Sequence, residues 1–374
     1  MSKRRSFNIT KAFFSFDEKC RTLLDKSRFT HPLYEKVILP MEAAIFKMGN
    51  YKYAPTFKKE FAESKKIYLK DVKSAEDLEK IKYDLLKAHI SIRMNNDEYF
   101  IYDFYHQNYW QRCEWLTDRE RLSSLMEKYG KEVYDELKDK SYFYQLTKKY
   151  FQREVCFIGE SYPEDSFVQF TSSHPRFIVK PIKGSLGADT FITSVGNASE
   201  AHKLYHELLS KGTWIVEELI KQHESMAAWN DTSVNTLRIP SFRLKDGCRI
   251  LQPFMRTGRK GSVVDNAGHG GIFAVFDADS GVVTTDGVDE HGGRFSCHPD
   301  SGLTFKGWTI PRYEELKALV SEVHHALPLH HRYVGFDFAL TEKGWVLIEG
   351  NWGQMVGQMA ELKGIRRQFI DYIS

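Results

Sequence analysis

The sequence predicts an α+β protein, because helix-forming and strand-forming segments occupy different parts of the chain. Residues 1–135 are charged and carry helical periodicity, without the apolar–polar alternation of a strand. The rest of the chain contains short runs of β-branched and aromatic residues separated by turns. At 374 residues the chain is long enough for two or three domains with a substantial core.

The N-terminal region is expected to be mainly helical. Its helix-forming segments are Leu33–Met48, Ala75–Ile92 and Asp118–Tyr129. The third of these helices begins with a capping box, in which the Thr117 side chain accepts a hydrogen bond from the N–H of Glu120. A further helix over Glu132–Phe151 should lead into the second region.

The second region is predicted to be rich in strands, interrupted by one early helix. Asn197 and Glu200 form a capping box for a helix over Ser199–Lys211, and Gly212 ends that helix. The helix therefore has a start signal and a stop signal of its own, independent of the strands around it.

Antiparallel strands are expected from Leu237 to Thr285. Asp246-Gly247 and Ser280-Gly281 lie between apolar runs there and have the composition of tight turns. Two helices should follow, at Arg312–Leu327 and near Val356–Ile373, on either side of a final hairpin.

That final hairpin consists of two apolar strands joined by the turn at 342–344. Asp337 lies in the first strand. Glu349 and Asn351 are two residues apart in the second, so they share a face, and pairing should bring that face next to Asp337. Two carboxylates and an amide oxygen are a hard oxygen set, which suits Mg²⁺ held together with nucleotide phosphates.

A candidate phosphate-binding loop follows an apolar strand that carries Lys180. The loop residues are Lys183, Gly184, Ser185, Leu186 and Gly187. Glycines allow the backbone to approach phosphates, successive N–H groups can form an anion-binding nest, and lysine adds a point charge. A purely structural turn is the alternative. The chain contains neither the P-loop pattern nor the G-x-G-x-x-G fingerprint of Rossmann folds.

The strand Thr213–Ile220 ends in two carboxylates, Glu217 and Glu218, and Glu224 follows. The exposed backbone of a strand end can bind an adenine edge, and a carboxylate can accept hydrogen bonds from ribose hydroxyls. The alternative is an acidic strand end that is simply solvated.

The order of these motifs resembles the ATP-grasp superfamily, which includes D-alanine–D-alanine ligase. The matching motifs are Asp139-Lys140, Lys180-Pro181 with Lys183–Gly187, Glu217-Glu218 with Glu224, and Asp337 with Glu349-Gly350-Asn351. Further motifs resemble the sugar-transfer-associated branch of that superfamily. They are Tyr150–Arg153, Ile220–His223, Ser233–Arg238, Arg256-Thr257-Gly258, Val264-Asp265-Asn266 with Gly270-Gly271, and His298-Pro299. The resemblance covers roughly residues 135–365 and has little support over residues 1–90.

The resemblance implies an ATP-grasp fold, in which two α+β lobes grip ATP, after a mainly helical N-terminal region. The implied boundaries are 1–135 for the helical region, 136–220 for the small lobe and 221–374 for the large lobe with the metal site. Lys140 and Lys180 would contact phosphates, and Glu217–Leu219 would lie at the adenine. Asp337, Glu349 and Asn351 would bind Mg²⁺.

The second substrate is expected to bind between Arg238 and Gly271. Guanidinium groups bind carboxylates and phosphates bidentately, as an acyl-phosphate enzyme requires. The candidate residues are Arg238, Arg256, Arg259, Asn266 and His269. His269 lies between residues of a glycine-rich loop and is a candidate general base. A flexible basic loop, with His269 as an ordinary turn residue, is the alternative.

By resemblance, the expected function is an ATP-dependent carboxylate–amine ligase that acts through an acyl phosphate in cell-surface polysaccharide biosynthesis or glycan modification. The partners would be a small carboxylate and an amine or glycan-linked substrate. A kinase for a sugar hydroxyl and a non-catalytic nucleotide-binding regulator are the alternatives, and the intact metal set disfavours the regulator.

Composition is consistent with a cytoplasmic enzyme. A net charge of +3 is too small to indicate nucleic-acid binding, and the chain contains no apolar run long enough to span a membrane. The five cysteines are scattered without a C-x-x-C motif, so they indicate neither a zinc site nor a disulfide framework. The pairs His324-His325 and His330-His331 suggest metal ligands at first sight, but neighbours on a helix do not face each other, so a solvated helix end is expected.

Overall fold

The computed structural model describes residues 36–37, 40–41, 43–44, 54–184, 189–262, 265, 270–353 and 355–374. The chain divides into two compact units, Met1–Glu120 and Arg121–Ser374. The predicted helix at Leu33–Met48 lies mostly outside the described residues. No helix in the described part of the chain is long and apolar enough to cross a membrane.

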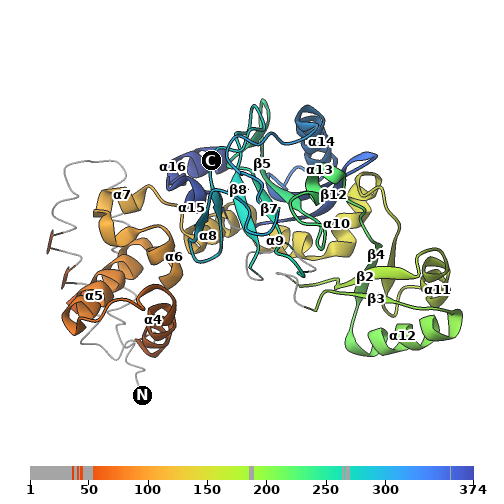
Figure 1. Ribbon diagram of the computed structural model, residues 1–374, viewed down its shortest axis with the longest axis horizontal. Coiled ribbons are helices and arrows are strands. Elements are labelled where there is room, and N and C mark those ends of the chain that lie inside the picture. Colours follow the sequence, from red (N-terminus) through yellow and green to blue (C-terminus); the bar gives the residue numbers. More distant parts are fainter. Residues whose placement is uncertain are drawn as a thin grey trace, which may run out of the picture. The chain divides into compact units, whose positions relative to one another are not determined.

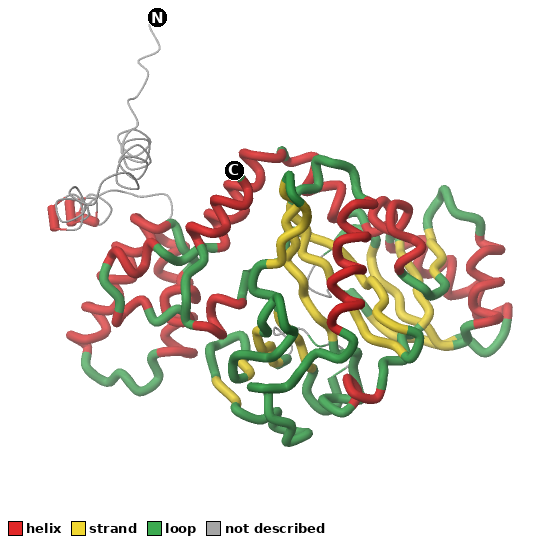
Figure 2. The backbone as a smooth tube through the Cα atoms, turned by 90° about the horizontal axis from the view of Figure 1, so that it is seen from above, coloured by secondary structure: helices red, strands yellow, loops and turns green. Residues whose placement is uncertain are grey.

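All the regular secondary structure in residues 54–120 of the first unit is helical, with loops between the helices (Figure 2). Its elements are α4 (Ala54–Tyr68), α5 (Ala75–Ile92), α6 (Asn96–Ile101), η2 (Phe104–His106), α7 (Tyr109–Cys113) and the start of α8 (Asp118–Tyr129). The predicted bounds of α5 and α8 are confirmed. The Glu120 N–H donates to Thr117 Oγ1 over 3.2 Å, as the capping box requires. Tyr99 and Phe104 are fully buried in the core of this unit.

The second unit contains a small four-stranded antiparallel sheet with the strand order β1-β4-β2-β3. Its strands are β1 (Val155–Ile158), β2 (Arg176–Pro181), β3 (Phe191–Ser194) and β4 (Trp214–Glu218). Helices α11 (Glu164–Ser173) and α12 (Ala198–Lys211) pack beside it (Figure 1) and share an apolar core with it. The predicted caps of α12 are confirmed, since Asn197 accepts from the Glu200 N–H at 3.0 Å and Gly212 follows the last turn.

An eight-stranded antiparallel sheet forms the larger part of this unit, in the order β10-β9-β8-β7-β5-β11-β12, with β6 paired to β5. The strands are β5 (Thr236–Leu244), β6 (Gly247–Ile250), β7 (Phe254–Thr257), β8 (Ile272–Val275), β9 (Gly287–Val288), β10 (Arg294–Phe295), β11 (Tyr333–Thr341) and β12 (Gly344–Asn351). Nearly every residue of β5 and β11 is buried, so these two strands form the centre of the core.

Helices α14 (Tyr313–Ala326) and α16 (Arg366–Ile373) contact this sheet, and α13 (Glu224–Ala227) follows the link from β4. The C-terminal helix prediction is wrong in one respect. The segment is split into α15 (Gly357–Glu361) and α16, because Leu362 adopts a left-handed conformation with φ of 51°.

The predicted helix over Glu132–Phe151 is also divided. It forms α9 (Lys131–Lys138), α10 (Lys140–Thr147) and the short η3 (Lys148–Tyr150). Asp139 has extended backbone angles between α9 and α10, and its carboxylate accepts hydrogen bonds from the N–H groups of Ser141 and Tyr142. A side chain that caps the second helix thus ends the first one. Because of this break, the N-terminus of α10 lies next to the residue that follows β2. There the Lys140 N–H donates to the Ile182 carbonyl at 3.1 Å.

Candidate active site

The three predicted oxygen ligands lie together on the large sheet. Asp337 on β11 is directly opposite Glu349 on β12 and directly opposite Arg238 on β5. Residues that face each other across antiparallel strands project their side chains on the same side. Asn351 donates from Nδ2 to Glu349 Oε1 at 3.0 Å, and its Oδ1 accepts from Arg238 at 3.3 Å. The hairpin geometry expected from the sequence is therefore present, with an arginine beside it.

Asp337 is held by two arginines. Arg238 makes a bidentate contact, with Nε to Oδ1 and with Nη2 to Oδ2 at 2.8 Å, and Arg256 Nη2 lies 2.8 Å from Oδ2. Burial, which by itself would raise the pKa of Asp337, is outweighed by the charges of Arg238 and Arg256, and the pKa falls to about 2. The carboxylate is therefore ionised at neutral pH, although it is only 3% exposed.

Two predicted substrate residues thus converge on a predicted metal ligand. Arg256 also donates to Thr236 Oγ1 at 2.9 Å and lies 3.7 Å from the buried carboxylate of Asp265. Thr236 in turn donates its N–H to Asp265 at 3.1 Å. Thr236 and Asp265 are not among the predicted site residues, although Asp265 is part of a motif that carries the family resemblance.

Arg259 has a different set of contacts. It donates to Asp300 from Nε at 2.7 Å and from Nη2 at 3.1 Å, and 39% of its side chain is exposed. The Lys260 N–H also donates to Asp300. Asp300 thus binds both the Arg259 side chain and the backbone of the neighbouring Lys260. Asn266 and His269 lie outside the described residues.

A second buried ion cluster surrounds Glu217 on β4. Lys180 of β2 contacts Oε1 at 2.7 Å, and Arg153 contacts Oε2 from Nε at 2.8 Å. Burial alone would raise the pKa of Glu217, but the two cations lower it to about 2. Glu217 is only 2% exposed, so the alternative of a solvated acidic strand end is wrong for this residue. The Glu217 carboxylate thus holds the ammonium group of Lys180, the residue expected from the sequence to contact phosphates.

Arg153 joins the two sheets and is missing from the predicted site residues. Besides Glu217 it donates to the Leu347 carbonyl of β12 at 2.7 Å. The signal for it in the sequence is its place in the Tyr150–Arg153 motif. Arg153 therefore links the small sheet to the β11–β12 hairpin.

The lysine at the start of α10 lies close to the same cluster. Lys140 Nζ donates to the carbonyls of Pro181 and Gly184 at 3.1 and 3.2 Å. Burial lowers the pKa of Lys140, and the neighbouring Glu349 carboxylate acts in the opposite direction. Lys183 pairs loosely with Asp139 at 3.8 Å and is largely exposed. Ser185 and Gly187 lie outside the described residues.

The link between the sheets contains the remaining predicted nucleotide residues. Glu218 accepts from the Glu154 N–H at 3.1 Å, Leu219 is half-buried, and Glu224 is exposed at the start of α13. The His223 N–H donates to the Leu340 carbonyl of β11 at 2.8 Å, which anchors the link to the large sheet.

Two antiparallel sheets joined by a short acidic link, with lysines on one sheet and a carboxylate hairpin on the other, define an ATP-grasp fold. The family model of sugar-transfer associated ATP-grasp proteins matches residues 120–371, about two thirds of the chain. This chain belongs to that family.

Solved structures with a partly similar chain path include a ligase and synthetases, all at low identity. The ligase PsnB, complexed with a minimal precursor, is 12% identical, with 61% of this chain and 56% of PsnB covered and a TM-score of 0.36. D-alanyl-alanine synthetase A from Vibrio cholerae is 12% identical, with 66% and 62% covered and a TM-score of 0.37. The D-cycloserine synthetase DcsG is 13% identical, with 64% and 71% covered and a TM-score of 0.40. The chain thus spans less than two thirds of the first two proteins. Comparison with curated proteins gives no match.

The second unit is expected to lose stability as the pH falls from about 4.5 towards 2. The folded pKa values of Glu217 and Asp337 are both about 2, below the value of about 4 for an unfolded carboxyl group. The unfolded chain binds more protons in this range, so acid favours unfolding, whereas above this range both groups are ionised in both states. Urea midpoints at pH 6 and pH 3, followed by tryptophan fluorescence, measure the effect. Equal midpoints would contradict the prediction.

Proposed function

We propose that this protein is a Mg²⁺-ATP-dependent ligase that joins a carboxylate to an amine through an acyl phosphate, on substrates of cell-surface polysaccharide biosynthesis or glycan modification. The observation that carries the proposal is the pair of arginines on Asp337, directly beside Glu349 and Asn351. An acyl-phosphate enzyme needs cations for a carboxylate next to oxygen ligands for the metal on the nucleotide. Membership of the sugar-transfer associated family supports both the use of ATP and the glycan setting.

The donor set fits Mg²⁺. Glu349 and Asn351 are in direct contact, and Asp337 lies opposite Glu349. A carboxylate has about four lone-pair sites, and Arg238 and Arg256 use three of those on Asp337. Glu349 is then the main charged ligand for the metal, with Asn351 beside it. When bound, Mg²⁺ would neutralise charge on the transferred phosphoryl group.

The protein side chains bind and orient the reactants. Lys180, which contacts Glu217, and Lys140 at the start of α10 would hold phosphate oxygens. Arg238 and Arg256 would hold the substrate carboxylate and then its acyl phosphate.

In the first half-reaction a carboxylate oxygen bonds to the γ-phosphorus, and the bond from that phosphorus to the bridging oxygen breaks, which releases ADP. In the second half-reaction the amine nitrogen bonds to the acyl carbon, phosphate leaves with the C–O electron pair, and the amine loses a proton.

The direct test is the substrate dependence of ADP release by the purified protein. Panels of uronic and amino acids are offered alone, with amines, and alongside neutral sugars. Release that requires both a carboxylate and an amine, with an amide product by mass spectrometry, supports the ligase. Release driven by a neutral sugar, with a phosphosugar product, would favour a kinase and overturn the proposal.

Mg²⁺-ATP is expected to raise the melting temperature of the protein. A ligand at a hundredfold excess over its Kd adds about 2.7 kcal/mol to the free energy of unfolding. Scanning fluorimetry with ATP, ADP and GTP, each with and without Mg²⁺, measures the shift. A shift for adenine nucleotides that depends on Mg²⁺ is expected, and the absence of any shift at millimolar ATP would contradict nucleotide binding.

Arg256→Gln should impair the reaction far more than Arg259→Gln. Arg256 faces Asp337, whereas Arg259 is paired with Asp300 at the surface. Loss of one partner of a desolvated charge pair costs about 2–5 kcal/mol, so kcat/KM for the carboxylate should fall by roughly 30-fold or more. Arg259→Gln should lower kcat/KM by less than about fivefold, because exposed ion pairs contribute at most about 1 kcal/mol.

The fold should tolerate Arg256→Gln because Arg238 continues to neutralise Asp337. Calorimetric titration with ATP separates the two possible roles of Arg256. An unchanged Kd for ATP places Arg256 with the acceptor, whereas a loss of ATP binding as large as that of Lys180→Ala would place it in the nucleotide pocket.

A further inference from the structure

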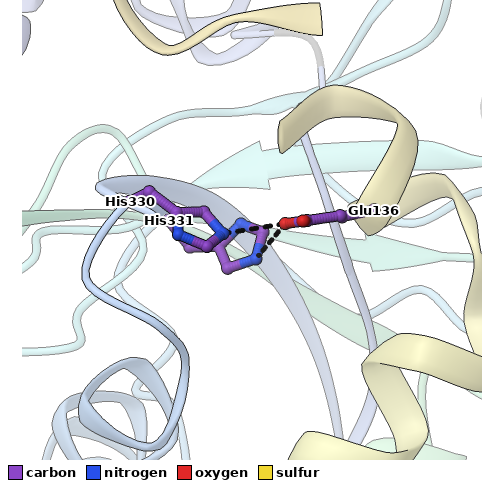
Figure 3. A group of neighbouring side chains, drawn as sticks. All are labelled: Glu136, His330 and His331. Atoms are coloured by element: carbon purple, nitrogen blue, oxygen red, sulfur yellow. Dashed lines mark hydrogen bonds and ion pairs between the residues drawn. The ribbon is translucent and has the colours of Figure 1, made fainter. Parts of the chain in front are cut away.

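A group of metal-ligating side chains lies outside the site described above. Glu136 projects from α9, and His330 and His331 lie in the loop between α14 and β11. Figure 3 shows both imidazole rings directed at the one carboxylate. The expectation that this histidine pair lies on a solvated helix end is wrong, because the helix ends at Ala326 and His331 is fully buried.

The donor atoms are already close to the spacing that a small metal ion requires. His330 Nε2 is 2.8 Å from Glu136 Oε2, and His331 Nε2 is 3.1 Å from the same atom. All three donor atoms lie within 4.8 Å of one another. A tetrahedral site with metal–nitrogen bonds of 2.0–2.1 Å places its ligand atoms about 3.3 Å apart. The two nitrogen–oxygen distances thus lie within about 0.5 Å of that spacing.

His331 supplies an independent observation. Its side chain is 0% exposed, Nδ1 has no hydrogen-bond partner among the described residues, and Nε2 has only the Glu136 carboxylate at 3.1 Å. Buried imidazole nitrogens are normally satisfied, because leaving them unpaired costs free energy.

His324 shows the contrast. It is equally buried, but its nitrogens contact Ser241 Oγ and the His331 carbonyl, both at 2.8 Å. A structural role accounts for His324 completely. It does not account for the side chain of His331, whose Nε2 instead lies against the Glu136 carboxylate.

We propose that Glu136, His330 and His331 form a site for a divalent transition metal, most simply Zn²⁺, with three protein ligands and a fourth position open to solvent. Two imidazoles and one carboxylate suit a borderline-soft ion, whereas Mg²⁺ prefers an all-oxygen set such as that of the β11–β12 hairpin. The His330 side chain is 48% exposed and that of Glu136 is 34% exposed, which leaves a path of entry for the ion.

The ligands connect two segments that carry active-site residues. Glu136 lies four residues before Lys140 in sequence, and His331 lies just before β11, which carries Asp337. A metal here would fix α9 to the start of β11 and so stabilise the second unit. The inference does not depend on the ligase reaction, because metal binding is measurable without nucleotide.

The experiment uses the full-length protein after treatment with a chelator. Calorimetric titration should show one equivalent of Zn²⁺, and Co²⁺ should produce the visible absorption bands of a tetrahedral nitrogen–oxygen site. His330→Ala and Glu136→Gln change partly exposed positions, so both proteins should fold. Each should weaken Zn²⁺ binding by more than about 100-fold, since loss of an outer-shell partner alone costs 10- to 100-fold.

The matched control is a second histidine–glutamate set on the surface. His202 and His206 lie 2.7 and 3.2 Å from Glu164, and both rings are at least about half exposed. His202→Ala should leave the tight site intact. The proposal is overturned if the wild-type protein takes up no Zn²⁺ at micromolar concentration, if His330→Ala and Glu136→Gln bind it normally, or if His202→Ala removes the binding.

Discussion

Glu349→Gln is expected to lower turnover at least ~100-fold, the scale for losing one electrostatic element where charge develops in the transition state. The substitution keeps the size of the side chain and can keep the contact with Asn351, which is 3.0 Å long in the wild-type protein. It removes the carboxylate charge that is not already neutralised by an arginine, since Arg238 and Arg256 both contact Asp337. Nucleotide should still bind, while the phosphoryl group is held less well during transfer.

The control for this substitution is Glu342→Gln, in the turn of the same hairpin. Glu342 is 64% exposed, and the His223 ring lies 3.9 Å from its carboxylate, so its substitution should leave turnover unchanged. Steady-state ADP release and calorimetric titration with Mg²⁺-ATP separate catalysis from binding. Turnover of Glu349→Gln close to that of the wild-type protein would show that the hairpin has a structural role only.

Glu217→Gln is expected to lower the free energy of unfolding of the second unit by about 3–5 kcal/mol, the cost of breaking a buried ion pair from one side. Arg153 and Lys180 would both lose their carboxylate partner in an environment where Glu217 itself is only 2% exposed. ATP affinity should fall as well, because Lys180 is no longer held in its position on β2. Urea unfolding of the wild-type protein and of Glu217→Gln measures the loss of stability, and calorimetric titration with ATP measures the loss of affinity.

The neighbouring Glu218 is the natural comparison. It lies on the same strand, is half-buried and accepts one backbone hydrogen bond from Glu154. Glu218→Gln retains an acceptor oxygen and should cost no more than about 1 kcal/mol, the net value of a typical hydrogen bond. Equal destabilisation by the two substitutions would contradict a special role for the Glu217 cluster.

Features that depend on nearby residues could be predicted from the sequence. The bounds of α5 and α8 and the caps of α12 follow from periodicity and from side chains that bond three residues away. The β11–β12 hairpin is also local, because alternation along one strand and a short turn determine which residues face Asp337. The order of such local motifs along the chain was sufficient to indicate the family.

The sequence patterns predicted the ends of two helices incorrectly. The helical pattern continues through Asp139, but its carboxylate caps the following helix and divides the segment into α9 and α10. Arg312 was expected to begin its helix, but it adopts a left-handed conformation with φ of 53° and precedes α14. Periodicity describes the face that a helix buries and is less sensitive to where the backbone leaves the helix.

The sequence by itself determined the family, the α+β class and the pairing of Asp337 with Glu349 across the final hairpin, because each of these follows from local patterns along the chain. The tertiary structure alone decided how the charges are paired. Arg238 and Asp337 are 99 residues apart, Arg153 and Glu217 are 64 apart, and His330 and Glu136 are 194 apart. The physical reason is that a buried charge takes its partner from whichever strand or helix packs against it, and only the packed sheets bring those elements together.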